Sequence, residues 1–364
     1  MKYSINLFFL VVITFALNAC LSNKKERTDY KIELGKVPMT AKFIDNDWYI
    51  WGGSVVEKDG QYHMFYSRWP KKYGFQAWVT NSEVAHALSD SPFGPFKFKD
   101  VVLPARGYEY WDGCVTHNPT VKEFDCKYYI YYMGNTVEGK VTGDLNWWKH
   151  RNNQRIGVAV ADNPNGPWKR YEQPLLNMPA DSLAPDALMM SNPSVTRSFD
   201  GRYILVYKCV GKKRKLPFGG PVVHMVAFSD SPTGPFIKCP NPIFTTKGCD
   251  FPAEDPYIWA QNDRLYAIIK DQKGFFTKAG RSLALFESID GIDWKLSKNP
   301  LVSTLKIEWE NRTQKVKSLE RPQLFIKNGI PIALMCASDT LDANGVKQSF
   351  NVQIPIVNEK RYNR

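Results

Sequence analysis

The sequence predicts an all-β fold, a five-bladed β-propeller whose blades are four-stranded antiparallel sheets. Three observations support this fold class. Two short signatures recur about every 60–75 residues, a period typical of repeat architectures. The segments between them are short runs rich in Tyr, Phe, Val and Ile, and aromatic residues make up 14% of the chain. No sustained helical period of 3.6 residues interrupts them. Four-stranded units repeated around an axis form a propeller, which leaves only short, protected sheet edges.

The first signature closes each unit with a tight turn. Residues 89–96 read Ser-Asp-Ser-Pro-Phe-Gly-Pro-Phe. Similar turns occur at 162–168 and 229–236, and a degenerate copy occurs at 288–294. Gly and Pro recur at fixed positions in these segments, among Ser, Asp and Asn residues. This composition indicates a turn rather than a strand.

The second signature opens each unit, and its first residue is here called the ring position. A proline follows the ring position in four copies, and a glycine follows it in the first copy. The ring positions are Gly52, Asn118, Asn192, Asp255 and Arg321. The residues just before them, here called pre-ring positions, are Trp51, His117, Ser191, Glu254 and Glu320. Five openings predict five blades.

After each opening, an inner strand, a turn and an aromatic second strand follow. Second strands are expected at 61–67, 128–133, 202–208, 264–270 and 330–336. Third strands are expected at 83–88, 155–161, 222–228 and 282–287, and 349–354 closes the last unit. We expect the segment near 34–44 and the tail after residue 354 to close the ring against each other.

The N-terminus predicts export. Lys2 precedes an apolar run over 7–17, and Leu17-Asn18-Ala19-Cys20 resembles a bacterial lipobox, which implies cleavage before Cys20 and lipidation of its thiol. An ordinary secretory signal is the alternative. The expected organisation is a signal peptide (1–19), a flexible tether (20–35) and a single propeller domain (36–364). The protein is expected to be an outer-membrane or periplasm-facing lipoprotein, with the cell surface as the other possibility.

The net charge of +12 permits anionic partners, such as acidic or sulfated glycans, although a lysine-rich surface explains it equally well. No nucleic-acid-binding motif occurs. The cysteine spacings match no zinc pattern and establish no disulfide. We therefore expect neither a metal nor another cofactor, and leave open a structural ion at the propeller axis.

The opening signature, the turns and the aromatic second strands resemble those of five-bladed glycoside hydrolases. The resemblance extends to family 43, to its relatives in families 32, 68 and 117, and to the family 130 phosphorylases, and it covers about residues 40–356. It implies a glycosidase with a carbohydrate substrate. Such folds carry many chemistries, so the site must decide the function.

The topology places the ring and pre-ring positions around one funnel at the axis. Glycoside hydrolysis uses two carboxyl groups, and a third raises the pKa of the acid. We expect Glu320 to be the general acid and either Asp255 or Asp47 the base, the other modulating the acid. Glu254 competes with Asp255, because neighbouring strand residues face opposite ways, and Asp112 is an alternative to Asp47. The family pattern has aspartate where this chain has Gly52.

Further residues are expected to bind substrate, and structural roles for them remain open. The polar candidates are His117, Asn118, Asn192, Arg68 and Arg321; the aromatic ones are Trp51, Trp69 and Trp111. The leading hypothesis is an exported, exo-acting, inverting glycosidase. A phosphorylase, with Arg68, Arg321 and Lys270 holding phosphate, and a non-catalytic glycan-binding lipoprotein are the alternatives. The sequence does not specify the sugar, the linkage or the anomer.

Overall fold

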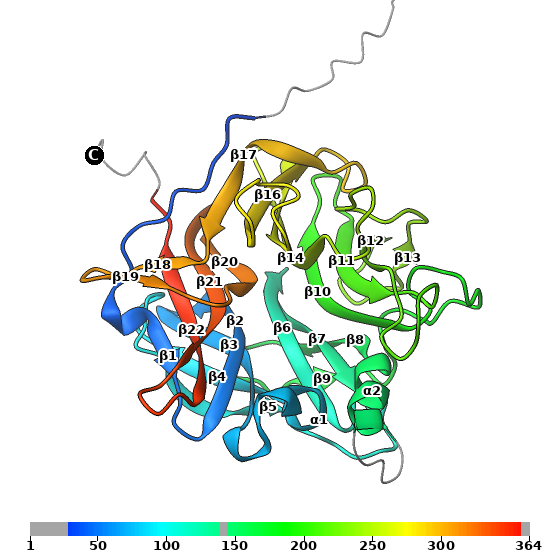
Figure 1. Ribbon diagram of the computed structural model, residues 1–364, viewed down its shortest axis with the longest axis horizontal. Coiled ribbons are helices and arrows are strands. Elements are labelled where there is room, and N and C mark those ends of the chain that lie inside the picture. Colours follow the sequence, from blue (N-terminus) through cyan, green and yellow to red (C-terminus); the bar gives the residue numbers. More distant parts are fainter. Residues whose placement is uncertain (1–27, 138–143, 358–364) are drawn as a thin grey trace, which may run out of the picture.

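The computed structural model describes residues 28–137 and 144–357. Within this part of the chain, five four-stranded antiparallel sheets surround a central axis, which confirms the predicted fold class (Figure 1). The predicted signal peptide, Cys20, the start of the tether and the C-terminal tail from residue 358 lie outside the described residues.

The strands of each blade follow one another from the axis outward. Blade one contains β2 (Trp48–Lys58), β3 (Gln61–Pro70), β4 (Glu83–Ser89) and β5 (Lys97–Leu103). Blade two contains β6 (Val115–Phe124), β7 (Lys127–Asn135), β8 (Arg155–Ala161) and β9 (Lys169–Arg170). Blade three contains β10 (Met189–Arg197), β11 (Tyr203–Val210), β12 (Val222–Ser229) and β13 (Ile237–Lys238). Blade four contains β14 (Ala253–Gln261), β15 (Arg264–Asp271), β16 (Ser282–Ser288) and β17 (Lys295–Thr304).

Blade five is assembled from both ends of the chain. It contains β20 (Glu320–Lys327), β21 (Ile330–Leu341), β22 (Lys347–Pro355) and the N-terminal β1 (Lys42–Ile44). Lys42 pairs with Val352, and an isolated bridge joins Leu34 to Ile356. This confirms the predicted closure of the ring. A small hairpin of β18 (Lys306–Glu308) and β19 (Thr313–Lys315) precedes blade five.

The part of the predicted tether that the structure describes is not free. Tyr30 lies with its ring centroid 4.6 Å from that of Tyr266, and Ile32 is buried in the core between blades four and five. The backbone N–H of Thr28 donates to Glu287 at 3.2 Å. The expectation of a tether to residue 35 is therefore wrong from residue 28 onward, because apolar side chains alternate along 30–34 and bury against the blades.

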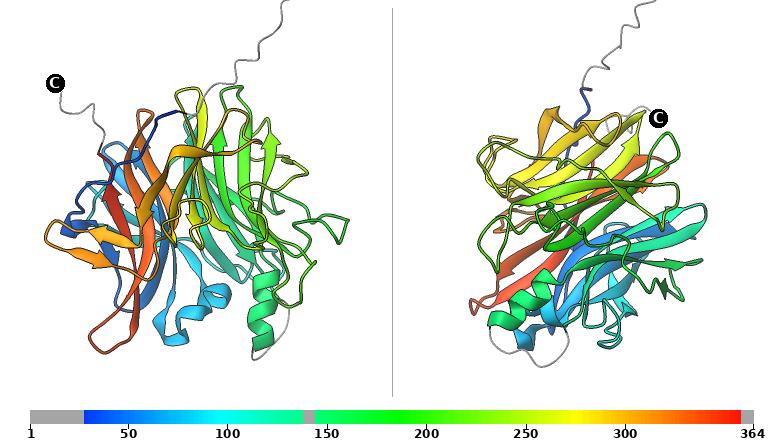
Figure 2. Two further views of the ribbon diagram at one scale, coloured as in Figure 1. Left: turned by 45° about the horizontal axis from the view of Figure 1, so that its top comes forward. Right: turned by 90° about the vertical axis from the view of Figure 1, so that its right-hand side faces the viewer.

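Short helices lie in two loops that join a second strand to a third strand. The loop between β3 and β4 contains η2 (Lys71–Tyr73), η3 (Phe75–Ala77) and α1 (Trp78–Asn81), and the loop between β7 and β8 contains α2 (Asp144–Asn152). Another short helix, η1 (Met39–Ala41), precedes β1. The sequence did not predict α2, because Trp147 and Trp148 are neighbours and form no apolar stripe of helical spacing. Figure 2 shows α1 and α2 at the same end of the molecule.

All five inner strands share a β-bulge at the ring position. The ladder shifts register there in every blade, for example between Trp51 and Ser54 and between Glu254 and Tyr257. The five ring residues have a positive φ, between 51° and 63°. Gly, Asn and Asp tolerate this left-handed conformation best, which explains four of the five residues found there. The repeated signature therefore specifies a bulge that redirects side chains at the axis.

Gly52 leaves the space that the Arg321 side chain occupies. A Cβ on Gly52, whose φ is +63°, would lie 3.4 Å from both Cβ and Cγ of Arg321. We expect Gly52→Ala to lower the free energy of unfolding by about 1–2 kcal/mol, from left-handed strain and tighter packing. Gly60→Ala is the matched control, since φ there is +80° and no atom lies within 4 Å of the added Cβ. Urea denaturation of both variants measures the difference; a smaller loss at Gly52 than at Gly60 would contradict this packing role.

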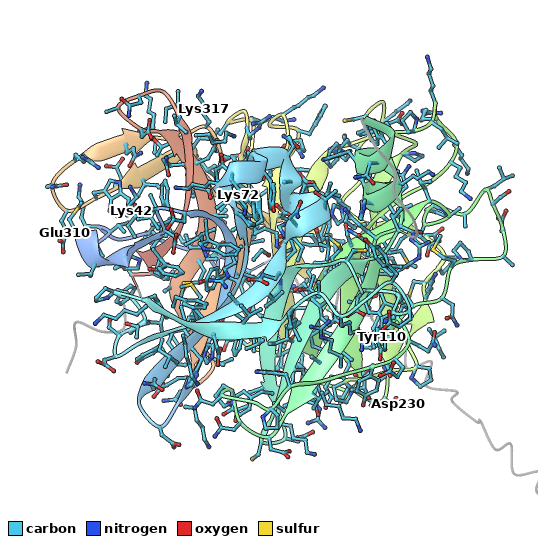
Figure 3. All side chains as sticks on the ribbon, turned by 90° about the horizontal axis from the view of Figure 1, so that it is seen from below. Lys42, Lys72, Tyr110, Asp230, Glu310 and Lys317 are labelled. Carbon is cyan, nitrogen blue, oxygen red and sulfur yellow. The ribbon has the colours of Figure 1, made fainter. Side chains whose placement is uncertain are left out.

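Charged residues of both signs lie on the outside. Lys72, Asp230, Glu310 and Lys317, labelled in Figure 3, are exposed. In the described residues no helix has the length and apolarity needed to cross a membrane.

Candidate active site

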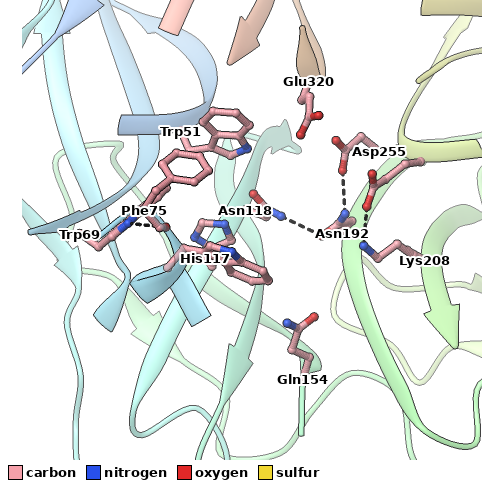
Figure 4. Close-up of a pocket in the computed structure, with 12 residues that line it drawn as sticks. Trp51, Trp69, Phe75, His117, Asn118, Gln154, Asn192, Lys208, Asp255 and Glu320 are labelled. Carbon is pink, nitrogen blue, oxygen red and sulfur yellow. Dashed lines mark hydrogen bonds and ion pairs between the residues drawn. The ribbon is translucent and has the colours of Figure 1, made fainter. Parts of the chain in front are cut away.

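A pocket of about 150 Å³ opens at the axis, at the end where the inner strands begin. One wall is aromatic and the other is polar and charged (Figure 4). The lining residues are Trp51, Trp69, Phe75, Trp78, His117, Asn118, Gln154, Asn192, Lys208, Glu254, Asp255 and Glu320. Four pre-ring residues, three ring residues and Trp69 from the predicted set meet here.

Blade one supplies the aromatic wall. The indole N–H of Trp69 donates to the carbonyl oxygen of Phe75 at 3.0 Å, which fixes η3 over the pocket. The Phe75 ring lies 5.6 Å from those of Trp51 and Trp69. Trp78 stacks on His117 at 5.0 Å. These contacts hold the wall rigid and leave one apolar side to the pocket.

The ring residues form a series of hydrogen bonds across the axis. The amide of Asn118 donates to Asn192 at 2.8 Å, and that of Asn192 donates to Asp255 Oδ1 at 2.7 Å. The backbone N–H of Arg321 donates to Asp255 Oδ2 at 3.1 Å. Both oxygens of Asp255 therefore accept hydrogen bonds from other ring residues, which holds this carboxyl group at the axis.

Arg321 lies on the axis rather than in the pocket. Its side chain is 1% exposed, and Nη2 donates to the carbonyl oxygen of Asn118 at 3.2 Å. The structure thus corrects its predicted role in substrate binding: a guanidinium enclosed by ring residues does not reach a ligand. Its positive charge also repels a cation at the axis, where a structural ion had been left open.

Four other predicted site residues lie outside the pocket. Arg68 bonds Glu83 at 2.9 Å and lies between the rings of Trp48 and Phe98, each 4.1 Å away. It therefore packs blade one instead of binding substrate. Asp47 is exposed in the turn before β2 and does not line the pocket. Its position does not suit a base.

Asp112 and Trp111 pack within blade two. Asp112 is fully buried and accepts hydrogen bonds from Arg106 Nε at 2.7 Å, from the Tyr132 hydroxyl at 2.7 Å and from Arg170 at 3.3 Å. The Trp111 ring stacks on Tyr132 at 5.7 Å. Both residues hold the loop before β6, so the structure corrects their predicted roles as a base and a sugar platform.

Two carboxylates in the pocket share one lysine. Lys270 Nζ lies 3.2 Å from Glu254 Oε2 and makes a shorter contact with Glu320 Oε1. Lys208 Nζ donates to Glu254 Oε1 at 2.7 Å, and Gln272 donates to Glu254 Oε2 at 2.8 Å. The nearest oxygens of Glu254 and Glu320 therefore lie within about 6 Å of each other, twice a hydrogen-bond length.

The surroundings shift the two carboxyl groups in opposite directions. Burial by itself would raise the pKa of Glu254, but the ammonium groups of Lys208 and Lys270 outweigh it and hold that pKa well below its ordinary value. For Glu320, burial raises the pKa; Lys270 opposes the shift, and Glu254 and Asp255 reinforce it. Glu254 therefore loses its proton at a lower pH than Glu320, so between the two pKa values Glu254 is ionised while Glu320 is protonated.

Glu254 and Asp255 both line the pocket, although they are neighbours on β14. The prediction that only one of them faces the axis is wrong, because the bulge at Asp255, with its φ of 53°, breaks the alternation of the strand. Burial raises the pKa of Asp255, and the charge of Glu254 adds to the shift.

His117 is a neutral side chain in the aromatic wall. Its Nδ1 lies 2.7 Å from the Ser82 hydroxyl. Burial, with smaller effects from Arg321 and Lys208, holds the pKa of His117 well below its ordinary value. A neutral imidazole suits hydrogen bonding to a sugar hydroxyl better than proton donation.

Sequence reasoning missed Lys208, Gln154, Gln272, Phe75 and Trp78, and assigned Lys270 only to an alternative function. A positional signal for the lysines exists. Ser191 pairs across the sheet with Lys208, and Glu254 pairs with Lys270. In blades three and four the residue opposite the pre-ring position is therefore a lysine that contacts Glu254. The others lie in loops without a repeat.

In the described residues, no group of three or more His, Cys, Asp or Glu side chains is arranged to hold a metal ion.

No family model matches the chain, and no curated protein matches it in sequence. Solved structures do match its fold. Zg3597, a family 117 glycoside hydrolase produced by the marine bacterium Zobellia galactanivorans, has a TM-score of 0.61 at 16% identity, over 89% of this chain and 90% of that protein. A BT0996 RGII complex has a TM-score of 0.58 at 16% identity, over 90% of this chain and 92% of that protein.

Native Bacillus subtilis arabinanase Arb43A has a TM-score of 0.51 at 14% identity, over 84% of this chain and 96% of that protein. The chain therefore has the five-bladed β-propeller fold seen in glycoside hydrolases of families 117 and 43. Because this fold supports several reactions, the residues of the pocket must indicate the chemistry.

Proposed function

We propose that this protein is a glycoside hydrolase, with Glu320 as general acid and Glu254 as general base. One observation carries the proposal: two carboxyl groups with opposite pKa shifts lie in one pocket, opposite an aromatic wall. The fold shared with glycoside hydrolases supports it. Asp255 is a positioning residue that also raises the pKa of Glu320.

In the proposed reaction, Glu320 donates its proton to the glycosidic oxygen as the bond to the anomeric carbon breaks. Glu254 takes a proton from the water that attacks this carbon. The products are a reducing sugar and the released hydroxyl of the leaving group. The carboxyl groups exchange their protonation states, and proton exchange with solvent restores them. No cofactor is needed for this reaction.

We further propose exo action, because a pocket of about 150 Å³ has room for one sugar ring and not for a polysaccharide passing through. We propose inversion because Glu254 is assigned to activate water rather than to attack the sugar. The limit of about 6 Å between the nearest oxygens of Glu254 and Glu320 lies below the 6.5–9.5 Å of inverting pairs and near the 5–5.5 Å of retaining pairs, so the carboxyl separation does not support inversion and the stereochemistry of the product decides it. NMR of freshly formed product tests this; a product with the anomeric configuration of the substrate would refute inversion.

For substrate class, a charge balance favours an anionic sugar. With Glu320 protonated, Lys208 and Lys270 exceed the single negative charge of Glu254 in this part of the pocket. Uronic or sulfated residues are therefore candidates, beside arabinosides, xylosides and galactosides. One structural neighbour is an RGII complex, and another is an arabinanase.

The direct test is sugar release from RGII, arabinan, xylan and sulfated galactans by the purified protein. We expect single sugars to accumulate from at least one of them. Glycan binding without release from any of these substrates would instead indicate a non-catalytic glycan-binding protein.

A phosphorylase is the second candidate, and the two lysines on Glu254 favour it. Lys208 and Lys270 stand where an attacking phosphate would need positive charge. Turnover that depends on inorganic phosphate and yields a sugar 1-phosphate would establish this reaction. Equal turnover without phosphate would exclude it.

We also propose that the protein is exported and anchored by a lipid on Cys20, at the outer membrane, periplasmic face or cell surface. The lipobox-like sequence supports this. Labelled palmitate supplied to expressing bacteria is expected to appear in the wild-type protein and in the membrane fraction. Cys20→Ser should abolish both, whereas Cys126→Ser, at an exposed cysteine of the propeller, should change neither. Equal labelling of Cys20→Ser would disprove the anchor.

A further inference from the structure

The aromatic wall of the pocket continues outward over blades two and three. Trp78, which lines the pocket, has its ring 6.0 Å from that of Trp147 on α2. Trp147 and Trp148 lie 4.9 Å apart, and Trp148 lies 6.2 Å from Phe218. We call Trp147, Trp148 and Phe218 the aromatic track.

Hydrogen bonds from three loops hold the track in place. The indole N–H of Trp147 donates to the carbonyl oxygen of Gln76 in the blade-one loop at 3.1 Å. Arg151 Nη1 donates to the carbonyl oxygen of Phe218 at 2.7 Å, and Asn152 Nδ2 donates to that of Pro217 at 2.9 Å. These contacts join α2 to the blade-one and blade-three loops, so the three rings keep their relative positions.

The track is not buried by the fold. The Phe218 side chain is 46% exposed, and Trp147 and Trp148 are partly exposed. The Arg151 guanidinium lies 5.0 Å from the Phe218 ring and 5.8 Å from the Trp148 ring. A row of exposed aromatic rings beside donors of hydrogen bonds marks a binding surface.

The continuity with the pocket indicates what binds. Sugar rings present C–H groups on their faces and hydroxyl groups at their edges, so aromatic rings contact the faces and polar side chains contact the edges. The pocket has the volume of one sugar ring, and the track continues outward from Trp78, which lines the pocket. We propose that Trp147, Trp148 and Phe218 are carbohydrate subsites that bind the remainder of a polysaccharide whose terminal sugar occupies the pocket.

This inference rests on the proposed function, and two measurements distinguish a failure of the track from a failure of the proposed hydrolase activity. The first is affinity electrophoresis in gels that contain RGII, arabinan or xylan. The second is kcat/KM on the cleaved polysaccharide and on a 4-nitrophenyl glycoside of the released sugar. Trp148→Ala and Phe218→Ala test the track. Phe199→Ala, an exposed aromatic in the turn from β10 to β11 at the opposite end, is the control.

We expect Trp148→Ala and Phe218→Ala each to weaken polysaccharide binding and kcat/KM roughly tenfold, through KM, the scale of one aromatic contact. The two track variants should cleave the short glycoside as well as the wild type does. Phe199→Ala should equal the wild type on both substrates and in polysaccharide binding. The Phe218 side chain is 46% exposed and its backbone carbonyl, which accepts from Arg151, is kept in Phe218→Ala, so we expect this variant to retain the fold.

Polysaccharide binding and kcat/KM equal to wild type in both track variants would overturn the inference, and so would a wild-type protein that binds none of the three polysaccharides. Binding without hydrolysis that is weakened in the variants would refute the proposed function and support the track. A wild-type dimer that Phe218→Ala converts to a monomer would assign these rings to a second copy instead.

Discussion

Glu320→Gln is expected to lower kcat by about 10²–10⁴-fold on substrates whose leaving group is a sugar, because the glycosidic oxygen then departs without a proton. The loss should be much smaller on 4-nitrophenyl glycosides, whose leaving group needs no protonation. Glu254→Gln should lower kcat by a similar factor on both kinds of substrate, because water activation is needed in each case. Steady-state kinetics on matched substrates measures the contrast.

The pH profile gives a second readout of the same assignment. Activity requires protonated Glu320, so it should fall as pH rises through the raised pKa of that group. Glu320→Gln should remove this limb of the profile. Glu57→Gln is the matched control, because it removes a carboxylate 2.6 Å from Lys327 at the other end of the inner strands. Equal kcat in Glu320→Gln and Glu57→Gln would refute the acid assignment.

The blades were predictable from the sequence because each strand repeats the same local pattern. β8 spans Arg155–Ala161 as expected, and β4, β12 and β16 each extend one residue past the expected end. Strand alternation and the Gly-Pro turns are local properties, so every copy of the repeat carries them. α2 was missed because its stability comes from contacts with other loops, such as Arg151 to Phe218.

The site was predictable only in part, because the sequence shows which residues reach the axis but not how they turn there. The positive φ at the ring position turns the Asp255 side chain into the same pocket as that of Glu254. The alternation of side chains along a regular strand does not predict this bulge. A ring position filled by Gly, Asn, Asn and Asp was the available signal, since these residues share tolerance of a left-handed backbone. Arg321 gave no such signal; its side chain lies on the axis beside Gly52.

Acidification from pH 7 to pH 5 is expected to lower the free energy of unfolding by on the order of 6 kcal/mol, a large part of the 5–15 kcal/mol typical of a domain. All five histidines of the protein are buried. Burial is the main cause that lowers the pKa of each imidazole. The pKa falls to about 4 for His63 and to about 3 for His86 and for His224. The pKa values of His117 and His150 are also lowered.

The sign follows from the ordinary pKa of 6.5 that these groups regain on unfolding. Above pH 6.5 neither state binds the proton, and the full stability is present. As pH falls from 6.5 toward 4, the unfolded state binds protons that the folded state excludes, at a cost of about 1.4 kcal/mol per histidine and pH unit. His63, His86 and His224 alone then give about 2 kcal/mol each at pH 5.

The contact between His63 and His86 shows why the folded protein resists protonation. His63 Nδ1 lies 3.0 Å from His86 Nε2, so one nitrogen must donate and the other accept. A proton on the accepting nitrogen would replace this hydrogen bond with two facing donors. Phe65 stacks on His86 at 4.7 Å. Asp100 Oδ1 lies 3.4 Å from His86 Nδ1 and favours the protonated form, but burial outweighs it and lowers the pKa of His86.

Asp255 and Glu320 act in the opposite direction, since their raised pKa values make the folded state bind protons sooner than the unfolded state. Urea denaturation at intervals from pH 7.5 to pH 5 measures the net slope. His63→Gln combined with His86→Gln should lower stability at pH 7.5 and remove about 4 of the roughly 6 kcal/mol of acid destabilisation that His63, His86 and His224 contribute between pH 7 and pH 5. An unchanged slope in this double variant would contradict the histidine account, and an NMR titration of the remaining imidazoles would then identify the groups that do bind protons.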